Sequence, residues 1–510
     1  MTRPGRLFID AALAAGAGLT AAWAAIPTAR PWLGIPALAL ALWLALRWQS
    51  RGSAVVLGAW AVVWFWCVLG WLQVVGSDAR LATAIVCSLP LVLVGALAPQ
   101  LARWPVGAVW IALAWTTQEW LRDRFPWGGF PWAGADFLSS TTWDAPWRVA
   151  GPPLAGFLVV LAAATLAVMA QQRTVRSLWI GPMALGATVL LMVLLGQTST
   201  INQPTKAAPL RVALIQGGVP GTGLDFQDRA QGVLKRHIAQ TDRLLAEVRR
   251  GRAPAPDLIV WPENSTDLDP RRDAFASTQI AAVVKRAGVP ILFGGVLDSD
   301  RANQVLNAAV LWAPGRAPEV VYVKQRPVPF GEFVPLRSSL GGLISRLNRI
   351  PADFQSGTTP GVVTLKGTRL GLVICFEIAH DDVVMATAAR NIDALIVLTN
   401  NATFQGTGQS AQQFEVSRRR ALQISRPVLT AATTGITAWV DRQATVKRQL
   451  PQVEPGFVSA EIVPVTPGAS SAVRWGRSLN AVLALLGAGA MLTAAIMELR
   501  HRRRFPKDSL

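Results

Sequence analysis

The chain has 510 residues, of which 51% are hydrophobic and only 15% are charged. A mean hydropathy of +0.35 is too apolar for an ordinary multidomain soluble protein, so part of the chain is expected to lie in lipid. The net charge of +19 is spread over the chain, which argues against nucleic-acid binding and favours anionic lipid head groups. The three cysteines and three histidines show no disulfide framework and no metal-ligand spacing, so neither a metal nor a cofactor is expected.

Eight apolar runs are long enough to cross a bilayer, which takes about 20 mostly apolar residues. The first is expected to be an anchor rather than a cleaved signal peptide, because further runs follow it directly. The sequence therefore predicts a transmembrane domain of seven helices over 1–202, and a final helix with a basic tail over 476–510. The runs cover about 7–25, 32–48, 54–74, 81–99, 104–121, 150–170, 177–197 and 478–497.

Positive charge marks one side of these runs. Arg47 and Arg103 lie in loops on the same side as the basic C-terminal tail, and the short loops of the other side carry fewer arginines. Because basic loops stay in the cytoplasm, both termini are expected to be cytoplasmic and residues 203–475 to lie outside. The loop over 122–148 faces that outer side, and its Trp, Phe, Gly and Pro content is typical of an interfacial segment or an ordinary aromatic belt.

Residues 203–475 change in character, because short β-branched or apolar runs alternate there with polar helical stretches. This alternation is typical of an α/β domain. Helices are expected over about 228–250 and 409–424. Strands are expected over 210–216, 257–263, 289–296, 306–312, 320–324, 370–377, 393–400, 427–434 and 436–441.

Three reactive side chains of this domain each follow an apolar run that reads as a strand. Glu263 comes after DLIVWP, Lys324 after VVYV and Cys375 after LGLVI. Functional groups of α/β domains gather at the carboxyl ends of strands. A neighbouring base or cation activates a thiol, and a lysine can stabilise an oxyanion. Each residue alone has an ordinary structural explanation, but together they indicate a cysteine nucleophile with a carboxylate base and a cation.

The strings around these residues are WPENS, VYVKQRPVPFGEFVP and GLVICFEIAH, and they resemble the Glu-Lys-Cys triad of the nitrilase superfamily. Because the domain lies between a seventh and an eighth predicted span, the whole chain resembles the apolipoprotein N-acyltransferase family. The resemblance implies a nitrilase-like α-β-β-α sandwich joined to a polytopic α-helical membrane domain of about eight transmembrane helices. It also implies the cytoplasmic (inner) membrane of a bacterium, with the catalytic domain on the extracytoplasmic face.

The resemblance further implies roles for individual residues. Glu263 would be the general base, Lys324 the cation that stabilises the oxyanion, and Cys375 the nucleophile that carries a thioester-bound acyl group. Two further glutamates, Glu332 and Glu377, occupy positions that support the site in the family. Lipid contacts are expected at Phe226, Trp132 and Phe376.

Two segments depart from the family pattern outside the triad. The string NNATFQG stands where many members have Asn-Asp-x-Trp-Phe-Gly, and Gln423 follows RAL where a glutamate is expected. Both departures bear on acceptor recognition and loop contacts rather than on the triad. The Gly- and Pro-containing stretch within 325–360 is a candidate lid, with a static surface loop as the alternative.

The implied reaction moves a fatty acyl chain from a phospholipid to the α-amine of a diacylglyceryl cysteine at the N-terminus of an apolipoprotein, in a ping-pong scheme. A separate polyprenol-phosphate mannose synthase is a further expected partner, because some relatives are fused to such a domain. Two other hypotheses stay open. A membrane-tethered nitrilase-like amidase would use the same triad with water as acceptor, and a catalytically inactive scaffold would bind lipid or partner proteins without needing Cys375.

Overall fold

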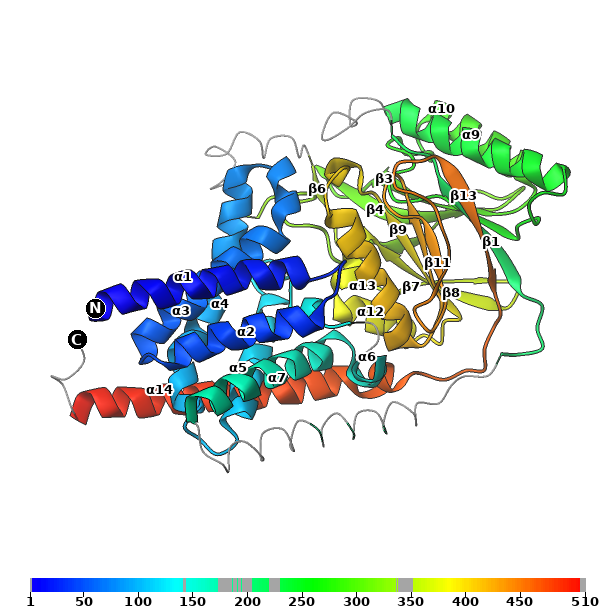
Figure 1. Cartoon of the computed structure of the whole chain (residues 1–510). Helices are drawn as coiled ribbons and strands as arrows, with labels where there is room; N and C mark the ends of the chain where they lie inside the picture. The colour runs from blue at the N-terminus through cyan, green and yellow to red at the C-terminus, as the bar shows by residue number, and fades with distance from the viewer. Residues whose placement is uncertain are drawn as a thin grey trace. The chain divides into compact units, whose positions relative to one another are not determined.

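The computed structural model describes residues 2–140, 144–172, 204–219, 230–335 and 352–504, together with positions 186, 190, 194 and 337. The chain forms two compact units (Figure 1). The helical unit comprises residues 1–199 and 475–510, and the sheet unit comprises residues 200–474.

The helical unit is built from apolar helices joined by short connections. Thr2 caps the first helix by accepting a hydrogen bond from the backbone N–H of Gly5, and Pro31 begins the second, where its missing N–H costs nothing. The longer helices are α1 (Arg3–Ala24), α2 (Pro31–Leu46), α3 (Ser50–Val68), α4 (Ser77–Leu101), α5 (Gly107–Arg122), α7 (Pro152–Gln172) and α14 (Arg477–Arg504). The shorter ones are η1 (Gly70–Val74), η2 (Ala135–Leu138), α6 (Asp144–Ala150) and η7 (Ala472–Gly476).

Five helices in the described ranges are long and apolar enough to cross a membrane, namely α1, α3, α4, α7 and the helix that runs from Ala472 to Arg500. Helix α2 is apolar but shorter, and α5 has 16 residues, fewer than the roughly 20 that a bilayer requires. The predicted span over 177–197 lies almost entirely outside the described residues. Large apolar side chains such as Phe8, Trp23 and Leu485 are exposed on the helical unit, as expected of surfaces that face lipid.

The sheet unit contains two sheets. In the first, the strand order is β13-β1-β2-β3-β4-β5, and β6 pairs with β4. In the second, the order is β12-β11-β10-β9-β8-β7. The strands are β1 (Leu210–Gln216), β2 (Leu258–Val260), β3 (Ile291–Asp298), β4 (Gln304–Trp312), β5 (Glu319–Val323), β6 (Asp353–Phe354), β7 (Gly361–Leu365), β8 (Thr368–Ile374), β9 (Ala394–Thr399), β10 (Val428–Ala432), β11 (Ala438–Val440), β12 (Val446–Gln449) and β13 (Gly456–Ile462).

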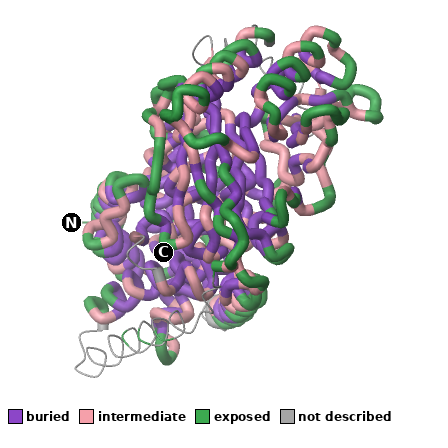
Figure 2. The backbone as a smooth tube through the Cα atoms, turned by 90° about the vertical axis from the view of Figure 1, so that its right-hand side faces the viewer, coloured by how far each residue is buried: buried purple, intermediate pink, exposed green. Residues whose placement is uncertain are grey.

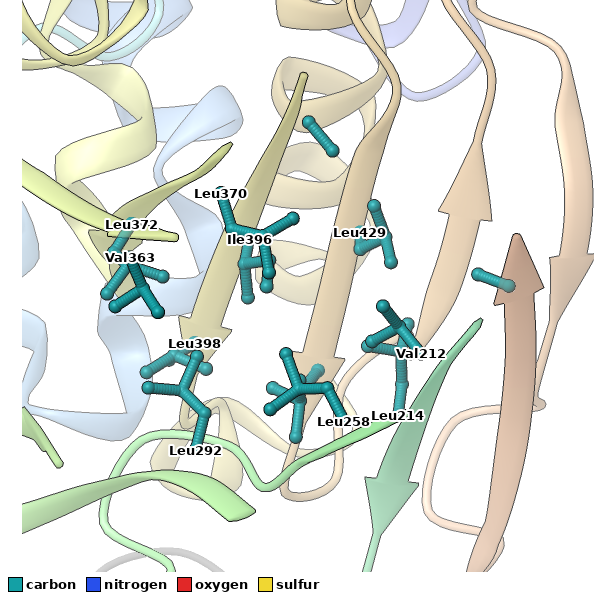
Figure 3. Close-up of a cluster of buried hydrophobic side chains, with 14 of the residues drawn as sticks. Val212, Leu214, Leu258, Leu292, Val363, Leu370, Leu372, Ile396, Leu398 and Leu429 are labelled. Atoms are coloured by element: carbon teal, nitrogen blue, oxygen red, sulfur yellow. The ribbon is translucent and has the colours of Figure 1, made fainter. Parts of the chain in front are cut away.

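The two sheets pack face to face through a core of aliphatic side chains. Figure 3 shows Leu214, Leu258 and Leu292 of the first sheet facing Leu398 and Leu429 of the second. The central strands of both sheets are parallel, β1-β2-β3 in one and β8-β9-β10 in the other. These central strands are buried along almost their whole length, and Figure 2 shows buried backbone in the interior and exposed backbone at the periphery.

Helices cover the outer faces of both sheets. Helices α9 (Ala230–Arg249) and α10 (Ala274–Ala287) pack on the first sheet, where Leu244 and Ile280 meet Ile259 and Phe293 in a second apolar cluster. Helices α12 (Asp381–Ala388) and α13 (Gln409–Ile424) contact β8 and β10 of the second sheet. These layers form the predicted α-β-β-α sandwich, and the fold class is confirmed.

All nine predicted strands are present, and the predicted helix over 409–424 coincides with α13. Two predicted strands differ most at their ends: β2 ends at Val260 rather than at residue 263, and β8 ends at Ile374, because residues 375–377 belong to a 3-10 helix, Cys375–Ala379. Four strands, β6, β7, β12 and β13, were not predicted from the sequence. Among them β13 pairs with β1 along seven residues and forms an edge of the first sheet.

Candidate active site

The three predicted triad residues come from both sheets of the sandwich. Glu263 follows β2 and Lys324 follows β5, two strands that run in the same direction in the first sheet, whereas Cys375 follows β8 in the second. The chain needs room to bring Glu263 inward, and Gly294 on β3 provides it. A Cβ atom at that glycine would lie 2.6 Å from the Cα atom of Glu263.

Lys324 is the centre of a buried ionic cluster. Its Nζ atom donates to Oε1 of Glu263 at 3.1 Å and to Oε1 of Glu332 at 2.9 Å. The lysine side chain is only 2% exposed. Burial alone would lower the pKa of Lys324, but the Glu263 and Glu332 carboxylates raise it well above its ordinary value. The lysine is therefore held as an ammonium ion.

Asn307 on β4 joins the two carboxylates. Its Nδ2 atom donates to Oε1 of Glu263 and to Oε1 of Glu332, each at 2.7 Å. The Oε2 atom of Glu263 accepts a hydrogen bond from the backbone N–H of Asn400 at 2.8 Å. The Oε2 atom of Glu332 accepts one from the backbone N–H of Val328 at 2.7 Å. These bonds fix both glutamates, because every carboxylate oxygen has a donor.

Cys375 has a left-handed backbone conformation, with φ of 55°, at the turn from β8 into the 3-10 helix. Such strained positions in non-glycine residues are concentrated at functional sites. The Oγ1 hydroxyl of Thr399 donates to the sulfur at 3.3 Å. The charges of the Glu263 carboxylate and the Lys324 ammonium both act on the pKa of the thiol.

The electrostatics favour a neutral thiol in the resting site. Loss of hydration and the adjacent Glu263 carboxylate raise the pKa of Cys375 to about 12, against the opposing effects of Lys324 and Thr399. A thiolate therefore does not accumulate near neutral pH. The proton has to leave as sulfur attacks, and the Glu263 carboxylate is the neighbouring acceptor.

Glu377 is fully buried and ties the ends of two strands together. Its carboxylate accepts the hydroxyl of Tyr322 at 2.8 and 2.9 Å and the backbone N–H of Ile374 at 2.8 Å. It also accepts the backbone N–H groups of Gln325 at 2.6 Å and Arg326 at 3.1 Å. Burial raises the pKa of Glu377, while Lys324 and the donated hydrogen bonds oppose that rise. The residue holds the segments that carry Lys324 and Cys375 beside each other.

The remaining predicted residues lie apart from this cluster or outside the described ranges. Phe376 follows Cys375 and packs edge-on against His380, with ring centroids 5.1 Å apart. Trp132 is fully buried in the helical unit, between the rings of Trp71 and Phe137. Phe226 lies outside the described residues, and so do residues 336 and 338–351 of the candidate lid within 325–360. Lipid contact at these aromatic residues stays a prediction.

The NNATFQG segment lies closer to Cys375 than its sequence suggested. Thr399, which contacts the thiol, accepts from Nε2 of Gln413 at 2.8 Å, and the Oε1 atom of Gln413 accepts from Nδ2 of Asn401 at 2.8 Å. The departure at Asn401 therefore belongs to a buried amide network beside Cys375. Gln423 lies elsewhere on α13, where its Nε2 atom donates to Oδ1 of Asp381 at 2.6 Å.

Sequence reasoning missed three residues of the site: Asn307, Tyr322 and Thr399. Asn307 is a single amide inside the apolar strand LNAAVLW, and Tyr322 is the one tyrosine of the chain. Both are unusual enough in a buried strand to have been recognised as candidates. Thr399 carried no such signal, because threonine is common in strands.

The comparisons with known proteins cover nearly the whole chain. The carbon-nitrogen hydrolase family model matches residues 211–469, and the model of the apolipoprotein N-acyltransferase N-terminal domain matches residues 16–165. An amidase from Nesterenkonia sp. of known crystal structure covers 55% of this chain and 98% of its own, at 16% identity and a TM-score of 0.38.

Similar proteins in three bacteria all carry the name apolipoprotein N-acyltransferase. The protein of Mycolicibacterium smegmatis is 32% identical, with 96% of this chain and 85% of the relative covered. Those of Ralstonia nicotianae and Nitrosomonas europaea are 30% and 29% identical, with 98% and 92% of this chain and 95% and 94% of the relatives covered. With a carbon-nitrogen hydrolase domain and the N-terminal domain characteristic of these enzymes, this chain belongs to the apolipoprotein N-acyltransferase family.

Proposed function

We propose that this chain is a bacterial membrane enzyme that N-acylates lipoproteins through a thioester on Cys375. Relatives named apolipoprotein N-acyltransferase, matched over almost the full length, support the reaction class. One observation supports the assignment of residues, namely the buried cluster in which Lys324 donates to Glu263 and the charges of both act on the Cys375 thiol. The acyl donor is a phospholipid, and the acceptor is the diacylglyceryl cysteine at the N-terminus of an apolipoprotein.

In the first half-reaction, the sulfur of Cys375 attacks the carbonyl carbon of the phospholipid ester. The Glu263 carboxylate accepts the thiol proton as the C–S bond forms. The resulting oxyanion is stabilised by the ammonium group of Lys324, which is already desolvated and oriented by its two carboxylate partners. When the C–O bond breaks, the leaving oxygen takes the proton from Glu263, and the products are a lysophospholipid and a thioester on Cys375.

In the second half-reaction, the α-amine of the lipoprotein cysteine attacks the thioester. Glu263 accepts a proton from the attacking nitrogen, and Lys324 again stabilises the oxyanion. Breakage of the C–S bond releases the amide product, and the Cys375 sulfur regains the proton from Glu263. The thiol that this step restores is the neutral form favoured by its raised pKa.

Glu332, Asn307 and Glu377 are positioning residues in this scheme. Glu332 and Asn307 hold the lysine and the base at fixed separation, and Glu377 holds the strand ends on which the lysine and the nucleophile lie. We further propose that residues 203–475 lie on the extracytoplasmic face, with 1–202 and 476–510 in or beside the membrane and both termini in the cytoplasm, because basic residues are concentrated on one side of the apolar runs. A polyprenol-phosphate mannose synthase remains an expected separate partner.

The test is the intact mass of the full-length protein after incubation with a phospholipid in detergent. We expect one added acyl chain on the peptide that contains Cys375, together with an equal amount of lysophospholipid. Cys375→Ala should abolish both, whereas Cys67→Ala, which removes a partly exposed cysteine of α3, should leave both unchanged. Addition of a diacylglyceryl-cysteine peptide should then discharge the adduct to an amide.

The two other hypotheses give different results in the same experiment. An amidase would release acid from a small amide and would form no lysophospholipid from phospholipid alone. A scaffold would show no adduct, and its biological effect would survive the Cys375→Ala substitution. Acylation that persists in Cys375→Ala would contradict the proposed nucleophile while leaving the family assignment intact.

A further inference from the structure

The helical unit contains a basic cavity that the acyl-transfer reaction does not use. The cavity has a volume of about 760 Å³ and lies between the N-terminal part of α1, the link from α2 to α3, the end of α4 and the end of α7. Four arginines and one aspartate line it among the residues that the structure describes, and together they have a formal charge of +3. The charged lining residues are Arg3, Arg6, Asp10, Arg47 and Arg103.

The aspartate holds one wall of the cavity in place rather than opposing an anion. Asp10 is 4% exposed, and its Oδ1 atom accepts from Nη1 of Arg47 at 2.9 Å. Its Oδ2 atom accepts from the indole N–H of Trp48 at 2.8 Å. The carboxylate is therefore satisfied on both oxygens, and it fixes Arg47 against α1.

The other arginines leave an excess of positive charge. Arg6 and Arg103 are exposed and have no ion-pair partner within the described parts of the chain. A hollow lined by several guanidinium groups attracts a phosphate, because guanidinium geometry matches phosphate oxygens. These charges come from α1 and from the segments that follow α2 and α4, and all of them line the same cavity.

The apolar surroundings distinguish a lipid from free phosphate. Helices α1, α4 and α7, whose ends form the cavity, are long and apolar enough to cross a membrane. Phe8 and Ile9, within one turn of Arg6 on α1, are 75% and 44% exposed, and Leu46 and Val168 lie in the cavity wall. Acyl chains would find apolar surface directly beside the basic group.

We propose that this cavity binds the phosphate-bearing head group of an anionic phospholipid, with its acyl chains along α1. Basic pockets between membrane helices are known to hold such head groups. The site is separate from Cys375, which lies in the sheet unit, and it does not depend on the proposed reaction. Its occupant is a structural lipid rather than an acyl donor.

The experiment uses the full-length protein in detergent with equal amounts of phosphatidylglycerol and phosphatidylcholine of the same acyl chains. Native mass spectrometry measures which lipid the protein retains. We expect a preference for phosphatidylglycerol that falls by about fivefold for each arginine removed, and so by about 25-fold in Arg6→Gln/Arg103→Gln. The charge-conserving variant Arg6→Lys/Arg103→Lys should keep most of the preference, which separates loss of charge from misfolding.

The matched control is Arg51→Gln/Arg500→Gln, which removes two exposed arginines of the same unit that do not line the cavity. Its preference should equal that of the wild type. Equal losses in the two glutamine variants would show a diffuse basic surface and overturn the proposal, as would the absence of any preference. Displacement of the lipid by millimolar inorganic phosphate would assign the cavity to a free anion and also overturn it.

Discussion

Replacing Glu263 with glutamine gives the sharpest test of the base. The amide keeps the length of the side chain, so its oxygen can still accept from Lys324 and Asn307. Its NH2 group then takes the place of the oxygen that accepts the backbone N–H of Asn400 at 2.8 Å. Two donors would face each other, and an unsatisfied buried donor lowers the free energy of unfolding by about 1–3 kcal/mol.

Catalysis and thiol acidity should change in opposite directions in this variant. Loss of a general base lowers the rate of acyl transfer by about 10²–10⁴-fold. The Glu263 carboxylate is also one cause of the raised pKa of Cys375, whereas Lys324 acts to lower that pKa. With the carboxylate removed and the lysine retained, the pKa of the thiol should fall below about 12.

The assay compares acyl transfer with the rate at which iodoacetamide alkylates Cys375 across a pH series, followed by the mass of the Cys375 peptide. Glu263→Gln should transfer acyl groups more slowly, yet its alkylation should level off at a lower pH than in the wild type. Glu319→Gln makes the same chemical change at an exposed position on β5 and should alter neither rate. Acyl transfer within threefold of the wild type, or an unchanged thiol pKa, would refute the reasoning.

Three further changes test the surroundings of the triad. Thr399→Val removes the hydroxyl that donates to the Cys375 sulfur at 3.3 Å, so the thiol pKa should rise and alkylation of Cys375 at a fixed pH should slow. Thr399→Ser keeps a hydroxyl and should restore the rate of alkylation. Equal rates in the two variants would contradict a role of this hydrogen bond in lowering the thiol pKa. Tyr322→Phe removes the hydroxyl bound to the buried Glu377 and should lower the free energy of unfolding by about 1.5–3 kcal/mol, measured by thermal unfolding; an unchanged melting temperature would be contrary evidence. Burial lowers the pKa of His237 to about 4, below its ordinary value of 6.5. The contribution of the neutral imidazole to the free energy of unfolding is therefore fully present above pH 6.5 and is lost as the pH falls. Between pH 7 and pH 5 this loss is about 2 kcal/mol. His237→Gln should flatten this dependence in thermal unfolding of the full-length protein, and an equally steep dependence in the variant would assign it to other groups.

The elements of the sheet unit could be predicted where sequence pattern and local burial agree. Strand β1 and helix α13 have the predicted bounds. Strand β1 is an apolar run that ends before Gly217, and α13 lies between Gly408 and Pro427, so local sequence signals specify their ends. Strands β7 and β12 are short and pair with β8 and β11, their neighbours in sequence, whereas the pairing of β13 depends on β1, which is distant in sequence. The turn at Cys375 was missed because a left-handed residue leaves no pattern in an apolar string.

The sequence alone determined the kind of chemistry, since Glu263, Lys324 and Cys375 each follow an apolar run and are flanked by family-like strings. It also determined that part of the chain is apolar enough for a membrane. Only the tertiary structure decided which groups surround those side chains. Asn307, Tyr322 and Thr399 reach the site from strands of both sheets, and no local pattern records which strand ends will meet. The neutral state of the thiol is likewise a tertiary property, because it results from the burial and charges that the packed sheets place around one sulfur atom.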